Sequence, residues 1–387
     1  MNNRAIRILI IAILAALFFP KKGSAIDLLP DFELGLDASG MITPQDSIKI
    51  SNEIKRDWIT LIKSGHYDIK DTTISYPKFV DFCVKAYIWA DKFFNSYDPE
   101  WVSGTGKRGK VRILSDNWSD IYDFRFADNP LLMTSSLYCN LGIQANYMAV
   151  SLGYSVDMNS IFSGKKTRHS KLDFSFSSSR FYGEAYYWEN EGDMHIHRVG
   201  NEYGKKFRDV LFDGLSFKAM GIMGFYIFNN RKFSYGAAYN LAKYQLKSAG
   251  SWLAGVSGTF YHANFDFTRL PERINEALKF PFDKYSLNYN SIDLIGGYSF
   301  NWVCNKHILF NTTTLPGIGV SFSSSDSTIG HKTLFSASVR EKLSLSYCHR
   351  QFFVIGTGTF HGNLLPHDQL AFLSGIINFQ LSTGVRF

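Results

Sequence analysis

Beyond residue 25 the sequence has no apolar run approaching the roughly 18 residues that a membrane-spanning helix needs. Its longest uncharged apolar stretches, such as residues 221–228, have the length of a β-strand. A helical membrane protein is therefore excluded. The chain beyond residue 25 is either a soluble periplasmic protein or a β-barrel in a membrane.

Cysteine is scarce and forms no motif. Cys83, Cys139, Cys304 and Cys348 include no C-x-x-C pair, which excludes zinc-ribbon and thioredoxin-like sites. None lies near the expected cleavage site, so we expect no lipoprotein anchor. An exported protein can form disulfides, but the sequence leaves the pairing of these four open.

Catalytic and cofactor motifs are also missing. No G-x-S-x-G sequence occurs. Residues 103–110 come near a phosphate-binding loop, but Val111 stands where Ser or Thr should bind magnesium, and a strand-like segment follows instead of a helix. His195 and His197 would share one face of a strand, but two histidines without a third ligand are usually only exposed side chains. We expect no cofactor and no metal.

The charge balance is mildly basic. The chain carries 41 Lys and Arg against 34 Asp and Glu, a net charge of +7. Nucleic acid is not an expected partner of an exported chain. The excess of positive charge is consistent with attraction of the protein to acidic lipopolysaccharide, or with a lumen that favours anions.

The N-terminus has the pattern of a secretory signal. Arg4 and Arg7 precede the apolar stretch 8–19, and small residues lead up to the bond between Ala25 and Ile26. Twelve apolar residues are too few to span a bilayer. We expect cleavage after Ala25 and exclude residues 1–25 from the fold.

The C-terminal residues 371–387 alternate between apolar odd positions and mostly polar even positions. A period of two indicates a β-strand with two different environments. Ending on an aromatic residue, this strand is typical of the closing strand of an outer-membrane barrel, with odd residues toward lipid and even residues toward the lumen. The apolar residues expected to direct barrel insertion are Phe379, Leu381, Val385 and Phe387.

The same alternation recurs upstream in residues 291–303, 308–323 and 333–348. Glu341 is a charged residue at a position of residues 333–348 where the alternation would place an apolar, lipid-facing side chain. We expect it near or beyond a membrane interface, because a charge that faces lipid is costly. Short and long connections alternate back from the C-terminus, which places that end in the periplasm. The remaining expected strands are residues 131–139, 141–157, 170–188, 209–228, 233–244 and 251–267.

These segments predict an all-β fold, an antiparallel transmembrane β-barrel of about 12 strands, with 10 as the alternative. Aromatic residues make up 16% of the chain while mean hydropathy is only −0.10, as expected when lipid-facing and water-facing positions alternate. So few strands enclose a narrow lumen rather than a wide channel.

Residues 170–188 show a reversal of parity. Apolar side chains occupy even positions before the serines at 177–179 and odd positions after them. Such a reversal predicts a β-bulge within one long strand. The polar residues expected inside the barrel are Arg180, Glu184, Asn240, Lys243, Asp293, Asn301 and Arg340. We expect these residues to form a structural network of salt bridges and hydrogen bonds that fills the lumen; the alternative is a substrate pathway.

Residues 26–109 are expected to be helical. Ser51 could cap a helix, and Pro77 could start a second helix whose apolar positions recur at steps of three and four. We expect this segment in the periplasm, on the rim of the barrel or partly inside it, and the barrel over residues 110–387. The apolar residues expected on the first helix are Ile54, Trp58, Leu61 and Ile62.

Several segments together resemble a family of outer-membrane proteins from Bacteroidota that is classed as a domain of unknown function. The segments that carry the resemblance are residues 179–187 (SRFYGEAYY), 228–230 (FNN) with 236–240 (GAAYN), 247–251 (KSAGS), 297–298 (GY) with 301–303 (NWV), and 384–387 (GVRF). The resemblance implies the barrel and its location over most of residues 75–387. It implies no activity and no catalytic residues.

The first functional expectation is a non-enzymatic outer-membrane barrel, either structural or passing small solutes poorly. The alternative is a barrel enzyme acting on phospholipid or lipopolysaccharide, which needs Ser, His and an acid or amide to meet in space. A third possibility is a surface receptor or adhesin. Expected partners are membrane lipid, lipopolysaccharide and the barrel-assembly machinery. Histidines near expected strand ends are His262, His349, His361 and His367.

Overall fold

The computed structural model describes most of residues 74–387, in two compact units that divide at Lys92 and Phe93. Residues 56, 57, 59, 69 and 71 are also described. The gaps are residues 108, 127–128, 148–149, 159–167, 192–193, 200–201, 204–209, 273, 275–282, 326–332 and 366–369. The expected signal peptide, its cleavage site and the expected apolar residues of the helix after Ser51 lie outside the described residues.

In the first unit, strand β1 (Arg56–Asp57) pairs in parallel with β2 (Ile74–Ser75). Helix α4 (Lys78–Phe94) begins directly after Pro77, as predicted, because proline suits the first turn of a helix. Lys85 and Asp81 form an ion pair of 2.7 Å along one face of α4. Among the described residues, no helix has both the length and the apolar character to cross a membrane.

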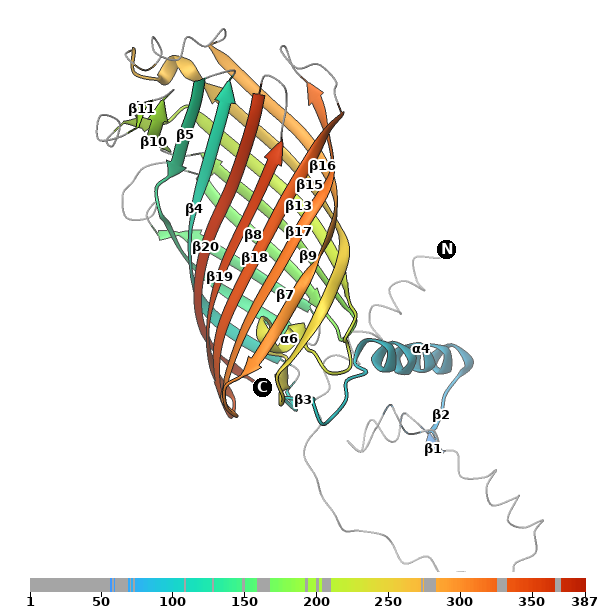
Figure 1. Ribbon diagram of the computed structural model, residues 1–387. Helices are drawn as coiled ribbons and strands as arrows, with labels where there is room; N and C mark the ends of the chain where they lie inside the picture. Colours follow the sequence, from blue (N-terminus) through green and yellow to red (C-terminus); the bar gives the residue numbers. More distant parts are fainter. Residues whose placement is uncertain are drawn as a thin grey trace, which may run out of the picture. The chain divides into compact units, whose positions relative to one another are not determined.

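The second unit is a closed antiparallel β-barrel of twelve strands, which confirms the predicted fold class and count (Figure 1). Its strands are β4 (Gly109–Phe126), β6 (Tyr138–Tyr147), β7 (Val150–Asp157), β8 (Arg168–Ser177), β9 (Phe181–Glu191), β13 (Leu215–Ile227), β15 (Ala249–Asp266), β16 (Lys284–Val303), β17 (Ile308–Ser325), β18 (Thr333–His349), β19 (Phe352–Leu365) and β20 (Leu370–Arg386). The ring closes at β4, which pairs with β20 on one side and with β6 on the other.

At the end of the barrel away from the C-terminus, shorter strands extend the wall (Figure 1). Strand β5 (Asn129–Ser135) pairs with the last residues of β4, and β10 (Met194–Val199) pairs with β5. Strands β11 (Glu202–Tyr203) and β12 (Leu211–Phe212) add to β10, and the turn η2 (Phe267–Arg269) follows β15. We call this the distal end, and the end that holds Phe387 the C-terminal end.

Side chains alternate across the wall as the sequence predicted. On β20, Phe379 is 54% exposed on the outside, whereas Ser382 is 2% exposed and faces the lumen. Outward apolar residues on other strands, such as Leu294 (67%) and Ile222 (62%), are even more exposed. A closed barrel with an apolar outside and a polar inside is the form in which strands can span a bilayer.

Glu341 lies on the outward parity of β18, between the exposed apolar residues Phe335 and Leu343, and is half-buried. Its expected position near a membrane interface stays a prediction. Directly opposite on β17, Thr314 donates a hydrogen bond of 2.7 Å from Oγ1 to Glu341 Oε2. This bond partly offsets the cost of a carboxyl group in that position.

Several predicted strands proved to be hairpins. The expected strand 141–157 contains most of β6 and all of β7, and 170–188 contains most of β8 and β9. The predicted β-bulge was wrong: parity reverses because the chain turns at residues 178–180. The Ser178 N–H donates to Phe181 O, and the Phe181 N–H donates to Ser178 Oγ, both at 2.9 Å. Three serines gave no glycine or proline signal for this turn.

The expected strand 233–244 is not part of the wall. It contains helix α6 (Tyr235–Ala238) and most of β14 (Lys243–Gln245), which pairs with β3 (Val102–Gly104). All four residues of α6 are buried, and Figure 1 shows α6 inside the barrel near the C-terminal end. Residues 228–248, which join β13 to β15, therefore place their buried middle part, residues 233–241, in the lumen. We call residues 228–248 the plug segment.

Candidate functional site

The plug segment is bonded to the inner wall of the barrel. Tyr239 Oη lies 2.6 Å from Asn311 Oδ1 on β17 and 2.9 Å from the Lys342 carbonyl oxygen on β18. Ser344, also on β18, donates a hydrogen bond of 3.0 Å to the Ala238 carbonyl. The short helix is thus fixed against two neighbouring strands.

Gln245 connects the two ends of the plug segment to each other and to β16. Its Oε1 accepts hydrogen bonds from the Ser234 N–H (3.0 Å) and from Asn301 Nδ2 (3.1 Å). Its Nε2 donates to the carbonyl groups of Lys232 (2.6 Å) and Lys247 (2.9 Å). The Gln245 side chain is buried, so these bonds satisfy polar groups that water does not reach.

Contacts on the other sides show that the plug segment crosses the lumen. Arg386 on β20 donates a hydrogen bond of 2.6 Å to Tyr244 Oη. On the β8 side, a Cβ atom added to Gly236 would lie 3.0 Å from Ser177 Oγ. The plug segment therefore touches strands on widely separated parts of the ring, and described residues occupy the lumen at its C-terminal end.

Ser234 caps α6 by accepting a hydrogen bond of 3.2 Å from the Ala237 N–H. Its Oγ also lies 3.4 Å from Tyr97 Oη, in the chain that leads to β3. Burial raises the pKa of Tyr97 to about 12, and the hydrogen bond to Ser234 opposes this rise only in part. The phenol is therefore neutral at physiological pH.

The distal end of the lumen is filled by an apolar core. Phe124 on β4 and Phe265 on β15, on opposite sides of the ring, have ring centroids only 4.9 Å apart. Tyr122 and Phe217 meet at 5.5 Å in the same region. Buried side chains of β5 and β10, including Met194, join this core. Side chains that meet across a barrel leave no room between them for an open channel.

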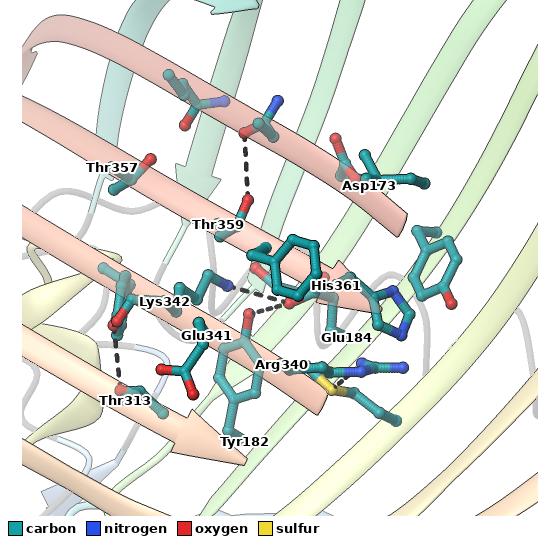
Figure 2. Close-up of a pocket in the computed structure, with 18 of the residues that line it drawn as sticks. Asp173, Tyr182, Glu184, Thr313, Arg340, Glu341, Lys342, Thr357, Thr359 and His361 are labelled. Carbon is teal, nitrogen blue, oxygen red and sulfur yellow. Dashed lines mark hydrogen bonds and ion pairs between the residues drawn. The ribbon is translucent and has the colours of Figure 1, made fainter. Parts of the chain in front are cut away.

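Between the plug segment and the distal core lies a chamber of about 180 Å³, shown in Figure 2. Lys342 on β18 reaches across it to Glu184 on β9, with an Nζ–Oε2 distance of 3.4 Å. Tyr182 donates a hydrogen bond of 2.6 Å to the same Glu184 oxygen. This ion pair joins two distant strands through the middle of the lumen.

Part of the chamber lining presents unpaired hydrogen-bond donors. Among the described residues, Trp188 Nε1 and Arg340 Nε have no hydrogen-bond partner. The Tyr186 and Trp188 rings stack at 4.4 Å, which fixes both. The lining also includes the carboxylate of Asp173 and apolar side chains such as that of Leu315, so the polar part of the chamber suits water.

The comparison with protein families matches residues 108–387 to a family described as a domain of unknown function (DUF4421). The chain belongs to the DUF4421 family. The DUF4421 match therefore begins next to β4 and includes the whole barrel. No curated protein matches the chain.

Solved outer-membrane barrels resemble the DUF4421 chain at low identity. The outer-membrane protease OmpT from Escherichia coli is 9% identical over 74% of this chain and 98% of its own, with a TM-score of 0.32. The translocator domain of the autotransporter NalP from Neisseria meningitidis is 9% identical over 80% and 96%, with a TM-score of 0.34. An outer-membrane channel from Pseudomonas putida F1 is 8% identical over 73% and 97%, with a TM-score of 0.32. Identities and TM-scores this low give no information about the function of this chain.

Of the seven polar residues expected inside the DUF4421 barrel, Glu184, Asn240 and Arg340 line the chamber. Asp293 faces the lumen and accepts a hydrogen bond of 2.7 Å from Ser336, while Asn301 holds the plug segment. Of the other two, Lys243 is in β14, within the plug segment, and Arg180 is in the turn between β8 and β9, with its guanidinium 4.4 Å from the centre of the Phe93 ring.

Sequence reasoning missed several chamber residues, notably Tyr182, Tyr186 and Lys342. Lys342 shares the inward parity of β18 with Arg340, so alternation alone could have identified it. Tyr182 and Tyr186 share the parity of Glu184, which was predicted to face inward, so alternation could have identified them as well.

The histidines lie in different places. His195 and His197 do share a face of β10, where His195 Nε2 lies 3.0 Å from Ser136 Oγ and His197 Nε2 lies 2.7 Å from Thr134 Oγ1. Among the described residues, no group of three or more His, Cys, Asp or Glu side chains could hold a metal ion. His361 lines the chamber, His262 contacts Asn288, the His349 ring faces that of His307 at 5.3 Å, and His367 lies outside the described residues.

Proposed function

We propose that this protein is an integral outer-membrane β-barrel of structural type, with a lumen that does not form an open diffusion channel. The apolar outer surface and the closed hydrogen-bonded ring support insertion into a membrane. The same proposal includes a source in Bacteroidota, removal of residues 1–25 and a periplasmic segment 26–109 before the barrel. It also includes the barrel-assembly machinery and lipopolysaccharide as partners.

The observation that carries the proposal is occupation of the lumen at both ends. The plug segment fills the C-terminal end through Tyr239 and Gln245, and the contact between Phe124 and Phe265 fills the distal end. Limited passage of small solutes would need both to move. Such a barrel anchors in the membrane without making it permeable.

Liposome swelling tests this proposal. Liposomes that contain the refolded protein should swell in a small neutral sugar no faster than protein-free liposomes. Liposomes that contain an open porin provide the positive control. Swelling at a rate comparable to the porin control would overturn the proposal.

A second candidate function, a barrel enzyme that acts on lipid, is favoured by the pair of Ser136 and His195. Hydroxyl and imidazole lie at the 3.0 Å distance at which a histidine can take the proton of a nucleophilic serine. The next residue, Leu137, is 60% exposed, which suits a site facing lipid. No hydrogen bond to an acid or amide orients His195 among the described residues.

A fluorogenic long-chain ester in detergent micelles would separate the two functions. An enzyme should lose its hydrolysis when Ser136 is replaced by Ala, whereas Thr134→Ala, which removes the neighbouring hydroxyl–imidazole contact, should keep it. Absence of hydrolysis by the folded wild type would remove the enzyme alternative.

The receptor or adhesin alternative has no support among the described residues, and much of the connecting chain it would use lies outside them.

A further inference from the structure

Three basic side chains gather in the lumen close to the C-terminal end. Lys110 and Arg112 point inward from β4, and Arg386 points inward from β20, where it is paired directly with Lys110. Their exposed fractions are 5%, 6% and 3%. Like charges placed this close and this deeply buried repel one another and lose their hydration.

Described carboxylates offset only part of this cluster. Asp173 and Asp116 act electrostatically on Arg112, whereas no carboxylate is among the groups that act on Lys110. None of the three basic side chains forms an ion pair with a described residue. Lys110 Nζ has no hydrogen-bond partner at all among them. Buried charges are normally paired, so three cations that described carboxylates offset only at Arg112 call for a negative partner from outside the chain.

The two arginines are held by neutral groups. Arg112 Nε donates to Gln144 Oε1, and Arg386 donates to Tyr244 Oη at 2.6 Å and to Cys348 Sγ at 3.1 Å. These contacts orient the guanidinium groups without cancelling their charge. Arg386 Nε still has no partner among the described residues.

Arginine and lysine complement each other as oxyanion ligands. A planar guanidinium presents several N–H groups in a fixed geometry, and a lysine ammonium adds a compact charge on a flexible stem. The site lies next to the rim, because Gly109, the neighbour of Lys110, exchanges backbone hydrogen bonds of 3.0 and 2.9 Å with Phe387. It is enclosed by the wall and by Tyr244, so a free anion fits better than the headgroup of a lipid.

We propose that Lys110, Arg112 and Arg386 form a binding site for a small oxyanion of the phosphate type near the C-terminal end of the barrel. Arg112 also lines the chamber, so one of the three side chains reaches that cavity. Such a site can exist whether or not the barrel conducts, because it needs only these three side chains.

Thermal unfolding of the folded protein in detergent, with inorganic phosphate as the probe, tests the site. Phosphate should raise the unfolding temperature of the wild type more than sodium chloride of equal ionic strength, since a ligand that binds only the folded state stabilises it. Lys110→Met should bind phosphate at least about tenfold more weakly, because a charge-assisted hydrogen bond is lost. Lys110 Nζ has no protein partner, so this variant should still fold.

The matched control is Lys107→Met, which removes an exposed charge near the same end and should respond to phosphate as the wild type does. An equal response to phosphate in Lys110→Met and wild type would overturn the proposal, as would an equal effect of chloride, which indicates screening only. If Lys110→Met fails to fold, calorimetric titration of the wild-type protein with phosphate tests the site instead. Heat that saturates with phosphate supports the site, and no heat refutes it.

Discussion

Replacing Gln245 with Met tests whether the plug segment is a fixed part of the barrel. Methionine is close to glutamine in size and shape but has no amide, so the variant removes five hydrogen bonds and leaves the packing largely intact. Each such bond contributes about 1 kcal/mol net, and its loss strands buried polar groups. We therefore expect the free energy of opening of the plug segment to fall by about 3–5 kcal/mol.

Amide hydrogen exchange in the folded, detergent-solubilised protein measures this opening directly. Protection of amides such as Ser234 N–H should fall in Gln245→Met, while amides in the middle of β16 keep their protection. Gln351 has an exposed side chain at the same end of the barrel, and Gln351→Met should change stability by less than about 0.5 kcal/mol. Equal protection of the plug segment in both variants would refute the assignment of Gln245 as its anchor.

Three further substitutions test the faces of the wall. Phe379→Lys should impair membrane insertion because a lipid-facing Lys costs roughly 2–4 kcal/mol, whereas Gln380→Lys, which faces the lumen, should be tolerated; equal membrane abundance of the two would contradict the assignment. Glu341→Leu should leave unfolding in lipid unchanged or make it harder, and a clear loss of stability would show that the bond from Thr314 is essential. Deleting Phe387 should reduce the yield of the heat-modifiable folded form, and an unchanged yield would argue against a terminal insertion signal.

Alternation predicted the wall of the barrel well wherever a strand had one apolar and one polar environment. Phe379 and Gln380 lie on opposite faces because neighbouring residues of a strand point to opposite sides. The same rule failed at residues 233–244, where odd positions from Phe233 to Leu241 are apolar. These residues are buried on all sides inside the lumen, so the pattern does not report two faces.

The chamber was largely beyond prediction because its residues come from many strands. Glu184 and Lys342 are far apart in the chain and meet only after the ring has closed. The inward orientation of these two residues could be predicted. Which inward residues lie at the same level along the barrel axis depends on the register between strands. That register depends on hairpins that the sequence did not reveal. The basic site is a similar case: net charge suggested a lumen that favours anions, but only strand pairing brought Lys110 next to Arg386.

Single-channel recording in planar bilayers tests the closed lumen most directly. The wild type should show no steady open conductance. Shortening the plug segment alone should change little, because the contact between Phe124 and Phe265 still fills the distal end. Combining that deletion with Phe124→Ala and Phe265→Ala should produce conductance. Steady porin-like steps in the wild type, or full opening on removal of the plug segment alone, would contradict a lumen closed at both ends.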